Sequence, residues 1–228
     1  MTSERSELIG GASRVASQRI ADLMAERILA GDLLPGTRII QDDLAEELRS
    51  SRLPVREALR ILQSRGLVTL KSNLGAWVSS MDLHDCQLSY RIRERVEPLL
   101  LAESMLSLTP EDITELEDIQ FRIEAGLSVE EFLVLDRRLH WATYRRHDAD
   151  QLTAIVTRLW DTTQHNRRAF TQLSGSGLHW TINAEHRLLI EAIKDRDVET
   201  AERVLTMHIR RTRIELSQHP ELFASPTA

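Results

Sequence analysis

The chain has 228 residues, a formal net charge of −6 and a single cysteine, Cys86, so it is long enough for two modest domains and cannot form an intrachain disulfide. The negative net charge argues against a protein that coats nucleic acid with its whole surface. No apolar run approaches the roughly 20 residues that cross a bilayer, and the polar first residues lack the apolar core of a signal peptide, so we expect a cytoplasmic protein with no membrane partner.

The charge is distributed unevenly along the chain. Residues 1–80 carry 11 basic and 10 acidic side chains, whereas residues 81–228 carry 18 basic and 25 acidic ones. This asymmetry favours contact with DNA through the N-terminal part alone, where a local group of arginines would supply the attraction to phosphates.

The first expected elements lead to a pair of short helices. Residues 1–12 are polar and end in two glycines, which predicts a flexible start, and apolar residues at helical spacing predict a helix over 13–30. Residues 38–40 can form a short strand. Residues 41–48 form a second amphipathic pattern, which a tight two-residue connection joins to the next helix. Two short helices at this spacing predict a helix-turn-helix.

The helix expected from Ser51 to Gly66 has one face that packs and another that is positively charged. Ser51 is a favourable N-cap, Pro54 falls in the first turn, and Gly66 can take the left-handed conformation that ends a helix. Four arginines lie largely off the apolar stripe: Arg52, Arg56, Arg60 and Arg65. Arginine can bond a guanine edge or a phosphate, so Arg52 and Arg56 are candidates for a DNA major groove. A solvated basic helix is the alternative, and this helix alone does not decide between them.

A hairpin is expected directly after this helix. Runs at 67–70 and 76–79 have the composition of strands, and Lys71-Ser-Asn-Leu-Gly75 between them contains the Asn and Gly that suit a tight turn. We predict that this hairpin is a wing beside the helix-turn-helix, with Lys71 and Gly75 near its tip.

These residues resemble the GntR-type transcriptional regulators. The matching blocks, in order, are Gly31–Gly36, Asp43–Leu48, Ser51–Leu59, Gly66–Val68 and Gly75–Val78. Five ordered blocks are far more specific than one short motif. The resemblance implies a winged helix-turn-helix that binds a double-stranded DNA operator, with Arg52 and Arg56 on the operator and Gly75 letting the wing approach the backbone or minor groove.

The resemblance has one departure in the DNA-binding part. Some family members carry a basic residue at the start of the first helix of the motif, where this chain has Asp42, an acid that would repel phosphates. The candidate DNA-contacting residues are Ser51, Arg52, Pro54, Arg56, Arg60, Lys71 and Gly75.

The pattern turns wholly helical after a break at 79–82. The expected helices cover about 83–107, 110–126, 128–147, 149–173, 178–195 and 197–218. Asp82 is a candidate cap, and Thr109 and Ser128 begin candidate capping boxes. We therefore predict a mainly α protein with a winged helix-turn-helix domain at 13–80, an antiparallel helical bundle at 81–218 and a flexible tail at 219–228.

Four residues of the predicted bundle suit a metal site. Asp136 and His140 are four apart on one helix and so leave the same face, while His186 and His208 sit mid-helix among apolar residues. Three histidines and one aspartate suit Zn²⁺, Ni²⁺, Mn²⁺ or Fe²⁺ and leave positions open for a ligand. The alternative is a set of separate core histidines, and the sequence alone leaves the two interpretations near parity.

The C-terminal region resembles the FadR-like ligand-binding domain of the same regulators, often called FCD. The resemblance implies that Asp136, His140, His186 and His208 are metal ligands. It also implies that Arg93 faces the pocket, where its guanidinium could clamp the carboxylate of a small organic acid. A salt bridge from Arg93 to Glu97, four residues on, is equally consistent with the sequence. One of Asn166, Arg167 and Arg168 could also face the cavity, but the sequence does not indicate which.

Together these features predict a homodimeric, metal-containing transcription regulator, with repression as the expected activity. Two winged-helix modules would read an inverted repeat, and a bound carboxylate metabolite would modulate operator binding. One alternative is a metal sensor in which the ion itself is the signal. Another is a metal-dependent hydrolase, but the sequence has no His-Glu-x-x-His motif and no acid/base pair at fixed spacing to the ligands, so we do not expect an enzyme.

Overall fold

The computed structural model describes residues 2–71, 75–126, 128–174 and 179–223, and the chain divides into two compact units, Met1–Met81 and Asp82–Ala228. Two of the sequence-based predictions fall partly outside the described residues: the wing turn, at 72–74, and the C-terminal tail, at 224–228.

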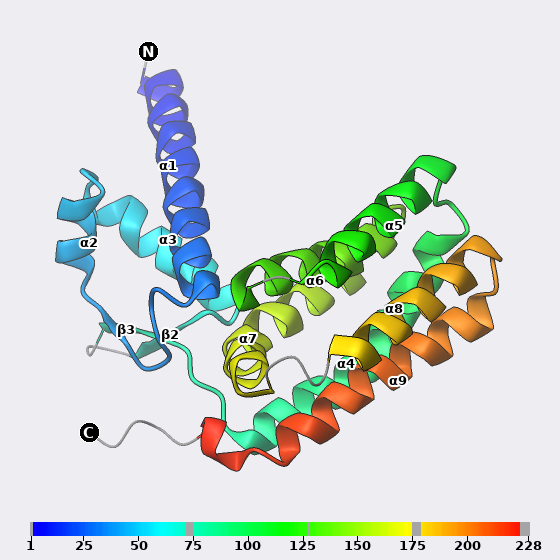
Figure 1. The fold of residues 1–228 in the computed structure, drawn as a ribbon. Helices are drawn as coiled ribbons and strands as arrows, with labels where there is room; N and C mark the ends of the chain where they lie inside the picture. The colour runs from blue at the N-terminus through cyan, green and yellow to red at the C-terminus, as the bar shows by residue number, and fades with distance from the viewer. Residues whose placement is uncertain (1, 72–74, 127, 175–178, 224–228) are drawn as a thin grey trace. The chain divides into compact units, whose positions relative to one another are not determined.

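The N-terminal unit packs helices against a small antiparallel sheet (Figure 1). Its elements are α1 (Thr2–Ala30), β1 (Arg38–Ile39), α2 (Gln41–Glu47), α3 (Arg52–Ser64), β2 (Val68–Lys71) and β3 (Gly75–Val78). Strand β3 is central, because it pairs with β1 on one side and with β2 on the other. The winged helix-turn-helix predicted from the sequence is confirmed, including the short strand beside the wing.

Helix α1 starts earlier than the sequence analysis predicts. The structure has it helical from Thr2, through Gly10 and Gly11, rather than from Ser13. Residues 4–8 include two glutamates, an arginine and a leucine, which are good helix formers, and these propensities oppose the cost of the two glycines.

The core of the N-terminal unit forms where α1 packs against α3 and α3 packs against the sheet. Buried residues recur on one stripe of each helix, and Ala76 and Val78 are buried on β3. The helix residues in this core include Ile20, Met24, Ile28, Val55, Leu59 and Leu62. Because side chains alternate across a strand, the burial of Ala76 and Val78 places Trp77 on the opposite, outer face of the wing.

Every regular element in the described residues of the C-terminal unit is a helix, as predicted. Its elements are α4 (Leu83–Met105), α5 (Pro110–Glu124), α6 (Val129–Thr143), α7 (Asp150–Ser174), α8 (His179–Lys194), α9 (Val198–Ser217) and the short 3-10 helix η2 (Pro220–Phe223). Asp82 caps α4 through the Asp85 amide, and Thr109 and Ser128 begin complete capping boxes at α5 and α6. These local signals explain why the predicted helix starts agree with the structure.

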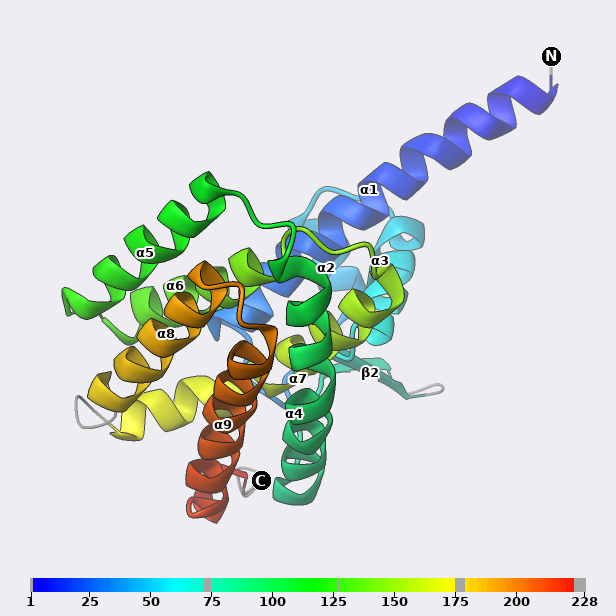
Figure 2. The ribbon, with the colours of Figure 1, turned by 90° about the vertical axis from the view of Figure 1, so that its right-hand side faces the viewer.

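The helices of this unit pack in neighbouring pairs. Helix α4 runs along α9, α8 packs against both α5 and α9, and α6 packs between α5 and α7 (Figures 1 and 2). No helix in the described part of the chain is long and apolar enough to cross a membrane.

Candidate functional site

The four predicted metal ligands converge in the C-terminal unit. Asp136 and His140 come from α6, His186 from α8 and His208 from α9, and one potential ligand atom from each lies within 4.8 Å of all the others. The three imidazole rings are 5.0–5.5 Å apart between centroids. The first three residues are buried and His208 is nearly so. The structure therefore joins residues from three helices into one polar cluster.

Hydrogen bonds orient two of these histidines. His186 Nδ1 lies 2.9 Å from Gln120 Oε1, and Gln120 Nε2 donates to the Glu124 carboxylate, which indicates that the amide oxygen faces the imidazole. His208 Nδ1 lies 2.8 Å from the Glu185 carboxylate. Since both partners are acceptors, each histidine donates through Nδ1, and this leaves Nε2 as the nitrogen on which a neutral imidazole carries the lone pair that binds a metal.

Two nitrogen atoms in the cluster are buried without a hydrogen-bond partner among the described residues, His140 Nδ1 and His186 Nε2. His186 Nε2 lies 3.5 Å from Asp136 Oδ1, too far for a hydrogen bond. An unsatisfied buried polar atom costs on the order of 1–3 kcal/mol. A cation among these residues would remove that cost, so the donor set fits a divalent metal.

The electrostatics place the cluster in the protonation state that metal binding needs. Burial lowers the pKa of His186 to about 3 and the pKa of His140 well below its usual value. For Asp136, burial alone would raise the pKa, but the charge of the Arg167 guanidinium holds it below its usual range. Two neutral imidazoles and an ionised carboxylate thus face one another before any metal enters.

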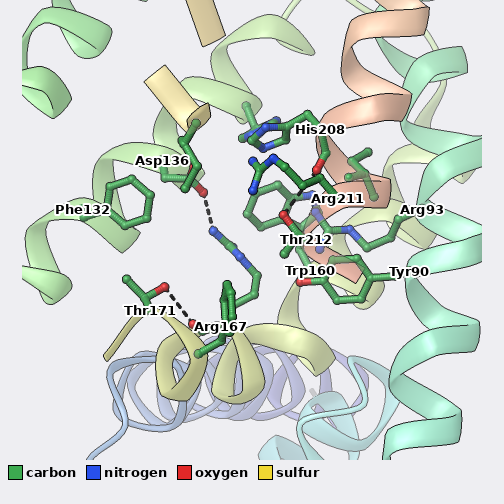
Figure 3. A pocket seen from close by; sticks show the side chains of 14 residues that line it. Tyr90, Arg93, Phe132, Asp136, Trp160, Arg167, Thr171, His208, Arg211 and Thr212 are labelled. Atoms are coloured by element: carbon green, nitrogen blue, oxygen red, sulfur yellow. Dashed lines mark hydrogen bonds and ion pairs between the residues drawn. The ribbon is translucent and has the colours of Figure 1, made fainter. Parts of the chain in front are cut away.

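A cavity beside this cluster is lined by three arginines (Figure 3). Arg93 donates from Nε to Glu97 at 2.5 Å and stacks over the Trp160 ring at 4.4 Å. Arg167 is ion-paired with Asp136, and Arg211 donates to Glu185 at 2.8 and 2.6 Å. Arg93 therefore forms the salt bridge that the sequence left open as an alternative and also lines the pocket.

In the N-terminal unit, the candidate DNA-contacting arginines form an exposed row on α3. Arg52 makes a two-pronged ion pair with Asp42, with distances of 2.6 Å from Nε and 2.8 Å from Nη2. Arg60 donates to Glu57 at 3.0 Å, and Arg56 Nε lies 3.7 Å from the same carboxylate. Asp42, expected only to repel phosphates, thus holds the guanidinium of Arg52.

The other candidates for DNA contact differ in their exposure and in their role in the backbone. Ser51 occupies the N-cap position with an extended backbone and is exposed, but its side chain makes no capping hydrogen bond. Pro54 is buried in the first turn of α3, so it shapes the helix start and presents no surface group. Gly75 has φ of +119°, a conformation that side chains rarely adopt. Lys71 lies at the end of β2, with its Nζ 5.1 Å from the Trp77 ring centre.

Comparison with known proteins gives two family matches that divide the chain between them. Residues 16–78 match the bacterial regulatory proteins of the gntR family, and residues 88–211 match the FCD domain, which is more than half of the chain. The chain belongs to the GntR family of transcriptional regulators, with an FCD domain. The regulator therefore binds DNA through its N-terminal unit, carries the domain that in this family takes small-molecule effectors, and is not an enzyme.

Individual relatives match almost the whole regulator. An uncharacterized HTH-type transcriptional regulator in an unstable DNA locus of Streptomyces ambofaciens is 28% identical over 215 residues, 90% of this chain and 88% of that protein. The HTH-type transcriptional repressor RspR of Escherichia coli strain K12 is 21% identical over 198 residues, 85% and 86% of the two chains. The solved structure of E. coli McbR/YncC superposes with a TM-score of 0.77 at 25% identity, covering 90% of the regulator and 98% of McbR.

The sequence analysis did not identify several residues beside the histidine cluster and on the wing. Gln120 and Glu185 orient His186 and His208, but neither stands at a recognisable spacing from the histidine it contacts. Arg38 and Trp77 pair across the outer face of the wing, with the guanidinium 5.7 Å from the ring centre. Here a signal did exist, because the alternation along residues 75–78 places Trp77 on the face opposite the core.

Proposed function

We propose that the regulator is a homodimeric repressor whose operator binding is modulated by a small carboxylate metabolite, held beside a divalent metal at Asp136, His140, His186 and His208. The observation that carries this proposal is the convergence of these four residues around two buried nitrogen atoms that lack hydrogen-bond partners among the described residues. Repression is the activity named for one relative, RspR.

The donor set limits which metals fit. Three imidazoles and one carboxylate suit Zn²⁺, Ni²⁺, Mn²⁺ or Fe²⁺, whereas Ca²⁺ and Mg²⁺ prefer oxygen ligands throughout. When bound, the ion would supply a Lewis-acid anchor for a carboxylate oxygen of the effector. Gln120 and Glu185 would keep the lone pairs of His186 and His208 directed at the ion.

The charges around the cavity favour an anionic effector. Each arginine that lines it is matched by one carboxylate, so the group is close to neutral without a metal. These pairs are Arg93 with Glu97, Arg167 with Asp136 and Arg211 with Glu185. A divalent ion would add two uncompensated positive charges to a largely buried site, which is costly. A carboxylate-bearing ligand would offset that charge, with Arg93 and Arg167 positioned at the cavity wall to bind it.

Each of the two domains would have its own role in this regulation. Residues 13–80 of each subunit would read one half of an inverted repeat, with Arg52 and Arg56 toward the major groove and the wing toward the backbone or minor groove. Residues 81–218 would bind the effector. The effector can change operator affinity only if it binds one arrangement of the dimer more tightly than another.

The decisive experiment is metal analysis of the protein purified without chelators. We expect near one equivalent of a divalent ion per chain, and less than a tenth of that in the triple variant His140→Ala, His186→Ala, His208→Ala. The control triple His84→Ala, His147→Ala, His219→Ala should keep its metal, because those histidines lie outside the cluster. Organic acids are then screened for release of the native protein from its operator with metal present. A native protein without metal would contradict the metal part of the proposal.

The metal-sensor alternative makes a different prediction in equilibrium dialysis. An effector-anchoring ion should survive dialysis against metal-free buffer, whereas a sensor should lose the ion as its free concentration falls and should lose or gain operator binding with it. Operator binding that follows free metal in the absence of any organic acid would favour the sensor.

A second prediction concerns Gln120. Replacing it with methionine keeps the volume but removes the acceptor for His186 Nδ1, so we expect metal affinity to fall by about 10- to 100-fold. The matched control is Asn183→Ala, which removes another partner of the Gln120 amide but leaves its bond to His186 in place. Competition titration with a chromophoric chelator measures both. Equal affinities in the two variants would exclude an orienting role for Gln120.

A further inference from the structure

Tyr90 brings a hydroxyl group to the cavity of the C-terminal unit. Its side chain is 1% exposed and lines the cavity, and the hydroxyl oxygen is buried without a hydrogen-bond partner among the described residues. Burial raises the pKa of Tyr90 to about 12, so the hydroxyl keeps its proton and can donate it to an anion. Because a buried polar group without a partner is destabilising, a bound molecule that offers an acceptor here would gain affinity.

Arg93 lies beside Tyr90 and also keeps a donor for a ligand. The two residues are three apart on α4, so they share one face of the helix, and both line the cavity (Figure 3). The Arg93 guanidinium lies 4.8 Å from the Tyr90 ring centre. Its Nε donates to Glu97 and its Nη1 lies 3.5 Å from the Thr163 hydroxyl, whereas Nη2 has no hydrogen-bond partner in the described part of the chain. We call the Tyr90 hydroxyl and Arg93 Nη2 the α4 donor pair, since both can donate to one carboxylate.

Trp160 lies between the α4 donor pair and the candidate metal ligands. Its ring centre is 4.4 Å from the Arg93 guanidinium and 5.1 Å from the ring centre of His140. A short molecule that lies along Trp160 would therefore reach the donor pair with one end and the histidine cluster with the other. Ile182 and Ile209 line the same cavity and suit a methylene chain between the two ends.

The charges of the cavity indicate what each end of that molecule carries. Each of the three arginines is ion-paired with one carboxylate, so a divalent ion at the cluster would leave two positive charges uncompensated. A monocarboxylate would offset one of these charges, and a dicarboxylate would offset both. A methyl group in place of the second carboxylate would also leave the α4 donor pair without an acceptor.

We propose that the effector is a short dicarboxylate, with one carboxylate at the metal cluster and the other bound by the α4 donor pair, and that Tyr90 distinguishes it from a monocarboxylate. This proposal rests on the proposed function and names its class of effector. The Tyr90 hydroxyl discriminates because it stays buried and unpaired when the ligand has no second acceptor, a penalty that a purely apolar wall would not impose.

Calorimetric titration of the native protein with one equivalent of Zn²⁺ per chain tests the class of effector. The probes are dicarboxylates, each matched with the monocarboxylate of equal carbon number: malonate with propanoate, succinate with butanoate, and glutarate with pentanoate. We expect at least one dicarboxylate to bind 10-fold or more tightly than its monocarboxylate. Equal affinities within every pair would overturn the second carboxylate site but leave a carboxylate effector in place. Failure of all the probes to bind would contradict the carboxylate effector of the proposed function itself.

The Tyr90→Phe variant tests the residue, because it removes the hydroxyl and keeps the ring. We expect its affinity for the preferred dicarboxylate to fall by about 10-fold or more, and its affinity for the matched monocarboxylate to change by less than about 3-fold. The matched control is Tyr144→Phe, since Tyr144 is also buried but donates to Glu97 and is not among the described residues that line the cavity.

The control should keep the native preference for the dicarboxylate to within about 3-fold. Circular dichroism checks that both variants are folded. A preference in folded Tyr90→Phe as large as in the native protein would exclude Tyr90 as the residue that distinguishes the two classes of acid.

Discussion

Replacing Glu97 with leucine is expected to destabilise the C-terminal unit by about 3–5 kcal/mol. Glu97 is fully buried and accepts hydrogen bonds from Arg93 Nε at 2.5 Å, from the Tyr144 hydroxyl at 2.9 Å and from Trp160 Nε1 at 3.0 Å. Leucine would leave the Arg93 charge and two polar hydrogens without their acceptor in a dry environment. The large cost arises because these three donors lose their acceptor while they stay buried, and not because the ion pair itself adds much to the free energy of unfolding.

Urea unfolding followed by circular dichroism measures this loss. Glu199→Leu is the matched control, because Glu199 also forms an ion pair with an arginine four residues away, but both partners are exposed. It should change stability by about 0.5 kcal/mol or less. Replacing Arg93 and Glu97 together with leucine should recover the part of the loss that comes from the unpaired buried charge, whereas Tyr144 and Trp160 still lack their acceptor. A Glu97→Leu variant as stable as Glu199→Leu would show that the buried network contributes little.

The features that could be predicted from the sequence are those set by residues close together along the chain. Asp82, Thr109 and Ser128 each satisfy the first amides of a helix within three residues, so α4, α5 and α6 begin where expected. The alternation along β3 and the helical spacing of Asp136 and His140 are local in the same sense. Ser51 shows the limit of such signals, because it takes the cap position without making the cap hydrogen bond.

The features that could not be predicted depend on how distant helices pack. Gln120 and His186 meet only because α5 lies against α8, and no local spacing links them. Arg167 could not be distinguished from its neighbours until the packing of α7 on α6 directed it at Asp136. The two alternatives for Arg93 proved compatible, because a guanidinium that bonds Glu97 through Nε still lies along the cavity wall.

The largest effect expected in the N-terminal unit is the loss of operator binding when Arg52 and Arg56 are both replaced by alanine. Each arginine that contacts a base through two hydrogen bonds contributes about 1–3 kcal/mol of discrimination, so we expect operator affinity to fall by about 30-fold or more. Both side chains are exposed on α3, near the helix start that such motifs direct into the major groove.

Fluorescence anisotropy with an operator selected from random duplexes by the native protein measures this effect. The charge-matched control is Arg122→Ala with Arg203→Ala in the C-terminal unit, where the Arg203 side chain is 76% exposed and ion-paired, compared with 78% for Arg52. Operator affinity within about 2-fold of native in the control would show that net charge alone is not responsible. Equal losses in the two double variants would contradict a specific role for the arginines of α3.

A substitution of Asp42 distinguishes two ways in which Arg52 could bind DNA, through a phosphate or through a base. Its carboxylate holds both prongs of the Arg52 guanidinium, and Arg52 must release or share that partner to bind DNA. If Arg52 binds a phosphate, Asp42→Asn should raise affinity for all duplexes and steepen the dependence of log affinity on log salt by about one unit. If Arg52 reads a base and Asp42 fixes its orientation, the same change should lower operator affinity while leaving non-specific binding almost unchanged. Because the pair is preformed and two-pronged, we expect the second outcome.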